Sequence, residues 1–122
     1  MFKLHQKASP ATEAIEYVTA GAELGIGTLV GYSGGEVVSN TTAPEYVTLG
    51  SAKDGEIIAV KRIYEDEIYE TTLSAAGDSL NVGDKVTVTA TQATATTASG
   101  IFEIIAIDGT TVGSKVRGLF RR

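Results

Sequence analysis

The sequence predicts an all-β protein, a small antiparallel β-barrel or β-tulip-like sandwich with a flexible N-terminal arm. Three observations support this class. Residues 18–38 interrupt short β-type runs with six glycines and show no helical period. Residues 81–86 repeat the pattern, since a Gly-Asp corner leads into Val and Thr. The expected strands are short and joined by tight turns, which favours antiparallel pairing.

The chain of 122 residues is long enough for one domain with its own core. We expect residues 1–13 to form the arm and residues 14–122 a single β-barrel domain. The first twelve residues show little periodicity and include Pro10, which is unfavourable inside a sheet. Removing residues 2–12 is therefore expected to leave the domain folded.

Turn signals divide the rest of the chain into short strands. The clearest strand is 56–64, where Ile58, Val60 and Arg62 share one face and Ile57, Ala59 and Lys61 the other. Thr and Ala alternate over Thr87–Ser99, so this segment could continue a strand or form an exposed loop. Of the two, a solvated loop is favoured. The expected strands are 14–19, 27–32, 36–39, 45–49, 56–64, 68–73, 85–91, 100–107 and 112–120.

The composition argues against an enzyme. The chain has no Cys, and its one histidine, His5, lies in the expected arm, so a Cys nucleophile, a His-based triad or a multi-His zinc site cannot form within one chain. We expect no catalytic function and no cofactor. The sequence also lacks a secretory signal and a long apolar run, so we expect synthesis in a cytoplasm and no membrane partner.

Charge is distributed unevenly along the chain. All fifteen acidic residues lie between Glu13 and Asp108 with only four basic ones, so this body carries −11, whereas residues 1–12 and 109–122 together carry +6. An acidic body disfavours nucleic-acid binding. The basic ends are expected either to meet an acidic neighbour, including another copy of the chain, or to be solvated.

Three groups of residues leave a binding site open. The carboxylates of Glu65, Asp66, Glu67 and Glu70 are close enough in sequence to gather a hard cation, although no Asp-rich calcium loop is present and a solvated turn is favoured. Lys61–Tyr64 is the one candidate for stacking nucleic-acid bases. A carbohydrate site would need tyrosines to converge, for which the chain offers Tyr32, Tyr46, Tyr64 and Tyr69.

The order of several segments resembles a known family. Ala-Gly at 20–21 precedes Gly-Thr-Leu-Val at 27–30, and a Gly-Gly turn at 34–35 follows. The later segments are Pro44–Leu49, Ile57–Ile63, Val82–Val86 and Val116–Phe120. Over roughly residues 14–120, this order resembles the small capsid decoration (head-stabilising) proteins of tailed bacteriophages.

The resemblance implies a non-enzymatic virion protein that binds the outer surface of a phage capsid and stabilises the shell. It implies the major capsid protein as partner, a homotrimer at local three-fold positions, a place on the capsid exterior and no nucleic-acid partner. The arm would supply the capsid contacts. Lys3 and Lys7 would pair with acidic capsid loops. Phe2 and Leu4 would add as a strand to a sheet edge on the shell, and His5 lies in the same contact segment.

Two other functions remain open from the sequence. One is a different β-barrel of the virion, such as a head fibre base, a head-completion protein or a tail-associated protein. The other is a small β-barrel module that binds carbohydrate or nucleic acid.

Overall fold

The computed structural model describes residues 1–7 and 14–121, which form ten β-strands joined by turns and loops, without a helix. None of the described segments is a helix able to cross a membrane. The strands are β1 (Lys3–Lys7), β2 (Ile15–Thr19), β3 (Leu29–Ser33), β4 (Glu36–Ser39), β5 (Tyr46–Thr48), β6 (Ile57–Arg62), β7 (Glu67–Thr72), β8 (Lys85–Val86), β9 (Phe102–Ile107) and β10 (Lys115–Phe120).

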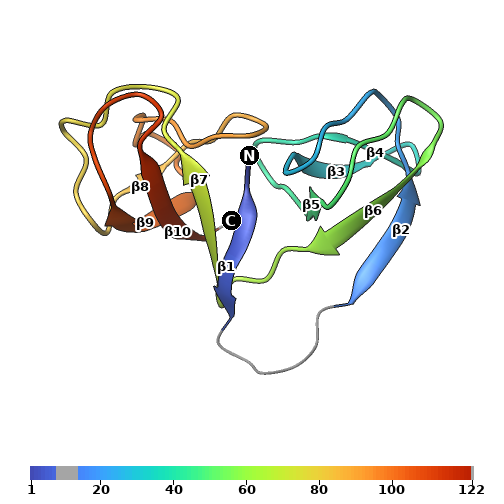
Figure 1. Cartoon of the computed structure of the whole chain (residues 1–122), viewed down its shortest axis with the longest axis horizontal. Helices are drawn as coiled ribbons and strands as arrows, with labels where there is room; N and C mark the ends of the chain where they lie inside the picture. Colours follow the sequence, from blue (N-terminus) through green and yellow to red (C-terminus); the bar gives the residue numbers. More distant parts are fainter. Residues whose placement is uncertain (8–13, 122) are drawn as a thin grey trace.

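The strands form two five-stranded sheets, which confirms the all-β class. Sheet A has the order β1-β7-β10-β9-β8, sheet B has the order β2-β6-β5-β3-β4, and every strand pair is antiparallel. The two sheets lie side by side with β1 between them (Figure 1). Neither sheet closes into a barrel, although a bridge between Ala20 and Val37 joins the two edges of sheet B at one point. The fold is a β-sandwich.

The sequence located nine of the ten strands, with differences at their ends. β6 alternates as expected, because Ile58 and Val60 enter the core of sheet B while Lys61 points toward sheet A. The main difference concerns 85–91, where β8 ends at Val86. Beyond it, residues 87–96 fold back on themselves through hydrogen bonds between Thr87 and Thr94 and between Thr87 and Thr96. Thr87–Ser99 is therefore neither a long strand nor a wholly solvated loop, since Val88 and Ala93 are buried.

The expectation of a flexible arm is wrong for residues 1–7. Residues 3–7 form β1, which pairs with β7 at one edge of sheet A. Phe2 is 1% exposed, and its ring lies 5.6 Å from that of Phe102 and 5.5 Å from that of Phe120. An alternation of Phe2 and Leu4 with polar residues is enough for an edge strand with one buried side. Residues 8–13, the rest of the expected arm, lie outside the described residues.

The buried apolar residues form two clusters. The larger one lies between the sheets and joins Leu29 and Val47 of sheet B to the aromatic rings of sheet A. At the centre of this cluster, the ring of Phe120 contacts the rings of Tyr69 and Phe102. Phe120 is fully buried and is the last core residue of the chain. The smaller cluster lies on the other face of sheet B and includes residues of β3, β4, β5 and β6.

Gly118 shows how closely the strands of sheet A approach one another. It lies in β10 next to a register shift against β9, where a Cβ would overlap the backbone oxygen of Glu103 and lie 2.9 Å from the ring of Phe102. Only glycine fits such an approach without moving a strand. This position keeps β10 between β9 and β7 and so places its basic residues beside β7.

Candidate functional site

Basic residues from the two ends of the chain meet on one face of sheet A. β7 lies between β1 and β10, and it pairs with both of them. Lys3 of β1 and Arg117 of β10 are both register partners of Glu70 in β7. Because paired residues of neighbouring strands point to the same side, these three side chains form one row across the sheet.

The Glu70 carboxylate is the centre of this row. Its Oε1 lies 3.2 Å from Lys3 Nζ, and its Oε2 accepts a hydrogen bond from Arg117 Nε at 3.1 Å. His5 Nδ1 is 4.0 Å from Oε2. Burial raises the pKa of Glu70, but the hydrogen bonds from Arg117 and Lys3 outweigh it and hold the pKa below its usual value. Glu70 is therefore a carboxylate that holds cations from both ends in place.

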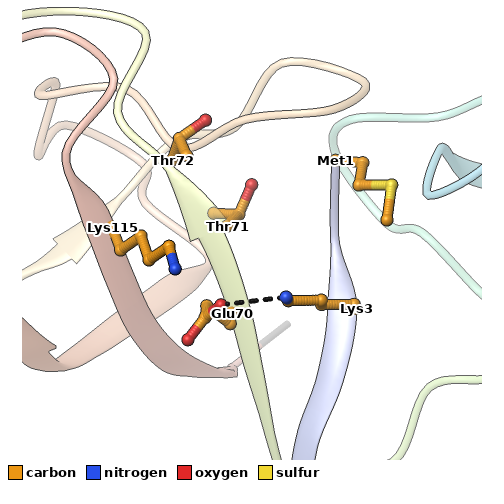
Figure 2. Close-up of a pocket in the computed structure, with 6 residues that line it drawn as sticks. All are labelled: Met1, Lys3, Glu70, Thr71, Thr72 and Lys115. Carbon is orange, nitrogen blue, oxygen red and sulfur yellow. Dashed lines mark ion pairs between the residues drawn. The ribbon is translucent and has the colours of Figure 1, made fainter.

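A hollow of about 150 Å³ opens beside Glu70. Figure 2 shows Lys3 and Lys115 approaching from opposite sides of β7, with Thr71 and Thr72 further along the strand. The hydroxyl of Thr72 accepts a hydrogen bond from Gln92 Nε2, whereas that of Thr71 donates to the backbone oxygen of Thr91. The residues that line the hollow are Met1, Lys3, Glu70, Thr71, Thr72 and Lys115.

We call the surface formed by Lys3, His5, Lys115 and Arg117 the basic face. Its three permanent cations surround one carboxylate, so it retains positive charge although the whole chain carries −5. Such a surface attracts carboxylates or other oxyanions of a partner. The basic face brings together cations from opposite ends of the chain. The charge distribution along the sequence is compatible with this meeting but does not require it.

The predicted contact residues are divided between this face and the interior. Lys3 and His5 are exposed on the basic face, and Lys7 is half-buried at the end of β1. Phe2 is buried, and Leu4 is half-buried against the same core. Phe2 and Leu4 are thus core residues in this structure, and their predicted contact with a shell is not compatible with these positions. Sequence reasoning missed Glu70, Lys115 and Arg117 as members of the site.

The acidic run does not gather around a common point. Within residues 1–7 and 14–121, no three His, Cys, Asp or Glu side chains form a group suited to a metal ion. Glu67 pairs with Lys61 at 2.6 Å, and Glu70 pairs with Lys3 and Arg117.

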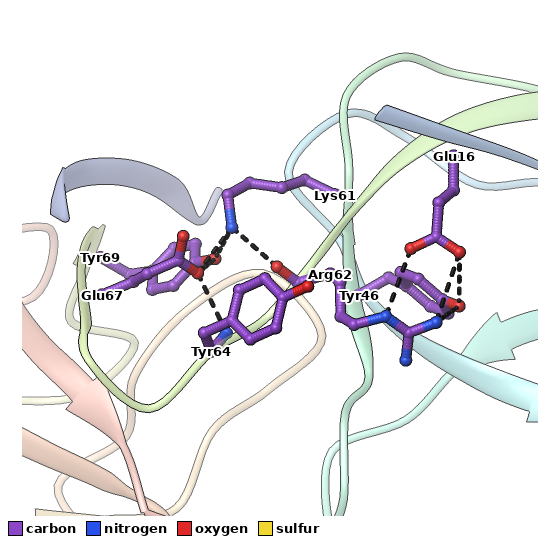
Figure 3. Close-up of polar contacts among 7 residues, drawn as sticks. All are labelled: Glu16, Tyr46, Lys61, Arg62, Tyr64, Glu67 and Tyr69. Carbon is purple, nitrogen blue, oxygen red and sulfur yellow. Dashed lines mark hydrogen bonds and ion pairs between the residues drawn. The ribbon is translucent and has the colours of Figure 1, made fainter. Parts of the chain in front are cut away.

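A second polar cluster links the two sheets (Figure 3). Lys61 of β6 and Glu67 of β7 are each 3% exposed, and Lys61 Nζ also lies 3.0 Å from the hydroxyl of Tyr69. The Tyr69 hydroxyl and the backbone N–H of Tyr64 both donate to Glu67 Oε1 at 3.0 Å. The bonded groups satisfy the buried charges, and the cluster connects the sheets.

The neighbouring Arg62 is also occupied. Its Nη2 donates to the Tyr46 hydroxyl at 2.6 Å, its guanidinium lies over the Tyr46 ring, and Glu16 accepts from both its Nε and Nη2. The hydrogen bond to Glu16 raises the pKa of Arg62, and burial raises that of Tyr46. Lys61–Tyr64 is therefore not a free stacking platform.

The tyrosines do not form an exposed cluster. Tyr46 and Tyr69 are buried, whereas Tyr32 and Tyr64 remain exposed.

Fold and geometry together define a two-sheet β-protein with one basic face made from both chain ends. In comparisons with known proteins, no family model and no curated protein matches the chain.

Proposed function

We propose that this chain is a structural protein of a tailed-phage virion that binds the outside of the assembled capsid and stabilises the shell. The observation that carries the proposal is the basic face, to which β1 and β10 contribute from opposite ends of the chain. The segment order that resembles decoration proteins supports the same function. No catalytic step is part of the proposal.

The basic face gives the proposal a physical basis. The partner would be the major capsid protein, contacted through acidic groups on its outer surface by Lys3, Lys115 and Arg117. Exposed charge pairs are individually weak. A homotrimer would multiply such contacts, because linked copies bind with an effective concentration that one copy lacks. The expected place of the protein is the capsid exterior.

The test is co-sedimentation of the full chain with undecorated heads of the phage that encodes it. Reversing one charge, Lys115→Glu, is expected to weaken binding about tenfold and to reduce its salt dependence, because a charge at the contact becomes repulsive. Lys53→Glu is the matched control, since Lys53 is an exposed lysine in the loop between β5 and β6 of sheet B, outside the basic face. Equal binding by both variants and the unmodified chain would remove the basic face from the proposal.

The number of copies bound per head separates decoration from the other virion roles. Saturation at a number in proportion to the capsid lattice is expected. Saturation at one vertex or a few copies would instead assign the chain to head completion or to a fibre base. Failure of the full chain to bind heads at any salt concentration would contradict both.

A further inference from the structure

A hollow of about 410 Å³ opens on sheet B, where β5 begins and β6 ends. The residues that line it are Ala43, Glu45, Arg62, Ile63 and Tyr64. The N–H of Ile63 donates to the backbone oxygen of Glu45 at 2.9 Å, so the two chain segments that form the hollow are joined. Its volume lies within the roughly 300–1,000 Å³ of sites that hold small molecules. We call it the β5–β6 hollow.

Tyr64 gives the β5–β6 hollow an exposed aromatic ring. The residue is 54% exposed. Lys61 Nζ lies 5.5 Å from the centre of the ring, and Lys61 is buried, so the exposed side of the ring is the one turned away from Lys61. The backbone N–H of Tyr64 donates to Glu67 at 3.0 Å, which fixes the residue on the fold. A flat apolar surface is therefore held in place at the edge of the hollow.

Arg62 and Glu45 supply polar groups at fixed positions beside this ring. Nε and Nη2 of Arg62 are bonded to Glu16 and Tyr46, which holds the guanidinium in place. Figure 3 shows Nη1 pointing away from both, and it has no partner among the residues that the structure describes. Oε1 of Glu45 accepts from the N–H of Tyr32 at 3.3 Å, which leaves Oε2 as an acceptor. The hollow thus combines a ring face, a hydrogen-bond donor and an acceptor.

The charges around the hollow disfavour an anionic ligand. Arg62, the cation in its lining, is already paired with Glu16 at 3.3 Å, and Glu45 adds a carboxylate. The two residues after the exposed ring, Glu65 and Asp66, are also exposed acids. A phosphate, a nucleic-acid backbone or an acidic peptide would be repelled there. A wholly apolar ligand would cover the polar groups without bonding to them, which costs free energy.

We propose that the β5–β6 hollow binds a neutral sugar ring of a glycan. The C–H groups of a sugar carry a small positive charge and pack against the negative face of an aromatic ring, here that of Tyr64. Sugar hydroxyls both accept and donate hydrogen bonds, so one ring can satisfy Arg62 Nη1 and Glu45 Oε2 together. The basic face lies on sheet A, so this binding is additional to the proposed attachment to a shell and does not depend on it.

The test is an NMR titration of the isotope-labelled full chain with four neutral probes, maltotriose, mannotriose, galactobiose and triacetylchitotriose. At least one of them is expected to shift the amide signals of Glu45, Arg62 and Ile63, with a Kd on the order of 1 mM. Tyr64→Ala is expected to weaken that binding about tenfold, whereas Tyr64→Phe keeps the ring and is expected to bind within about twofold of the unmodified chain. Tyr17→Ala is the matched control, since Tyr17 of β2 is 71% exposed and lies outside the hollow.

Circular dichroism and thermal melting establish that each variant is folded. Glu45→Gln provides a second variant and is expected to weaken binding of the same sugar several-fold. The absence of shifts with all four sugars overturns the proposal, as does an equal loss of binding in Tyr64→Ala and Tyr17→Ala. Shifts at the hollow with inorganic phosphate or a proline-rich peptide, and with none of the sugars, would assign it to another ligand and make the proposal wrong.

The two proposed functions can be separated with the same variants. Tyr64→Ala is expected to keep head binding, because Tyr64 lies outside the basic face. Lys115→Glu is expected to keep sugar binding, because Lys115 does not line the β5–β6 hollow. Loss of sugar binding in a folded Lys115→Glu variant would contradict the assignment of the sugar to this hollow.

Discussion

At the residue scale, Glu70 connects the two ends of the chain. It is buried, yet it contacts Lys3 from β1 and Arg117 from β10 on opposite sides of β7. A buried carboxylate without partners would favour its neutral form. The lowered pKa of Glu70 shows that the two cations more than compensate for burial. The carboxylate thus supports both the stability of sheet A and the arrangement of the basic face.

The pH dependence of stability tests this role. A carboxyl whose pKa is lower in the folded than in the unfolded state stabilises the fold at pH values above its unfolded-state pKa. This stability is lost as the pH falls through the folded-state pKa. Glu70→Gln is expected to lower the free energy of unfolding at pH 7 by about 2 kcal/mol, since hydrogen bonds to a charged group are lost. The difference between the two proteins should disappear at a pH below the folded pKa of Glu70.

Urea unfolding at a series of pH values measures that difference. Glu23→Gln is the control, because Glu23 is exposed and a change there is expected to stay within about 0.5 kcal/mol at every pH. A Glu70→Gln difference that is constant from pH 7 to the acid limit would contradict the proposed ion-pair origin.

At the element scale, the junction of β6 and β7 holds the sheets together through a charged pair in the core. Lys61 Nζ has three oxygen partners there, the Glu67 carboxylate, the Tyr69 hydroxyl and the backbone oxygen of Arg62. Breaking a buried pair from one side leaves a charge without compensation, whereas removing both charges costs much less. The junction is therefore expected to show strong coupling between its two members.

A double-mutant cycle measures this coupling. Lys61→Met is expected to lower the free energy of unfolding by about 3 kcal/mol, because Glu67 is left buried with only neutral donors. Lys61→Met combined with Glu67→Gln is expected to be more stable than the sum of the two single changes predicts. Additive effects in chemical denaturation would show that the pair contributes no coupling.

The elements also show what local pattern can and cannot predict. β6 is recognisable in the sequence because apolar residues occupy both of its faces over six residues. One lysine and one arginine therefore do not hide the strand pattern. β1 contains one apolar residue, Leu4, with Phe2 just before the strand, and a register shift between Leu4 and Gln6 ends the alternation. Its partner β7 begins sixty residues later, which no local pattern indicates. The arm was expected for this reason.

The same limit applies to the candidate site. Lys3 and His5 could be selected from the sequence because they lie in a basic terminal segment. Glu70 and Arg117 could not be joined to them, because their contact depends on β1 and β10 both pairing with β7. Charge distribution predicted that the ends are basic, and sheet topology decided that they meet.

At the scale of the whole molecule, the N-terminal segment completes the sandwich. Phe2 contacts two aromatic rings of sheet A, and its N–H donates to the backbone oxygen of Gly27, in the turn that precedes β3 of sheet B. Gly27 has a φ of +72°, and a side chain there would overlap Met1. One short segment thus contacts both sheets, so the folded body and the first seven residues are expected to be interdependent.

Deleting residues 2–7 tests this interdependence. Truncating one buried Phe costs about 3–5 kcal/mol, and the deletion also removes an edge strand and the Lys3 partner of Glu70, against a total stability of about 5–15 kcal/mol for a typical domain. We expect the shortened chain to lose most of its cooperative thermal transition, and a synthetic peptide of residues 1–8 to restore it in part. A scanning calorimetry transition unchanged by the deletion would show instead that residues 14–121 fold alone and that β1 only adds to a finished sandwich.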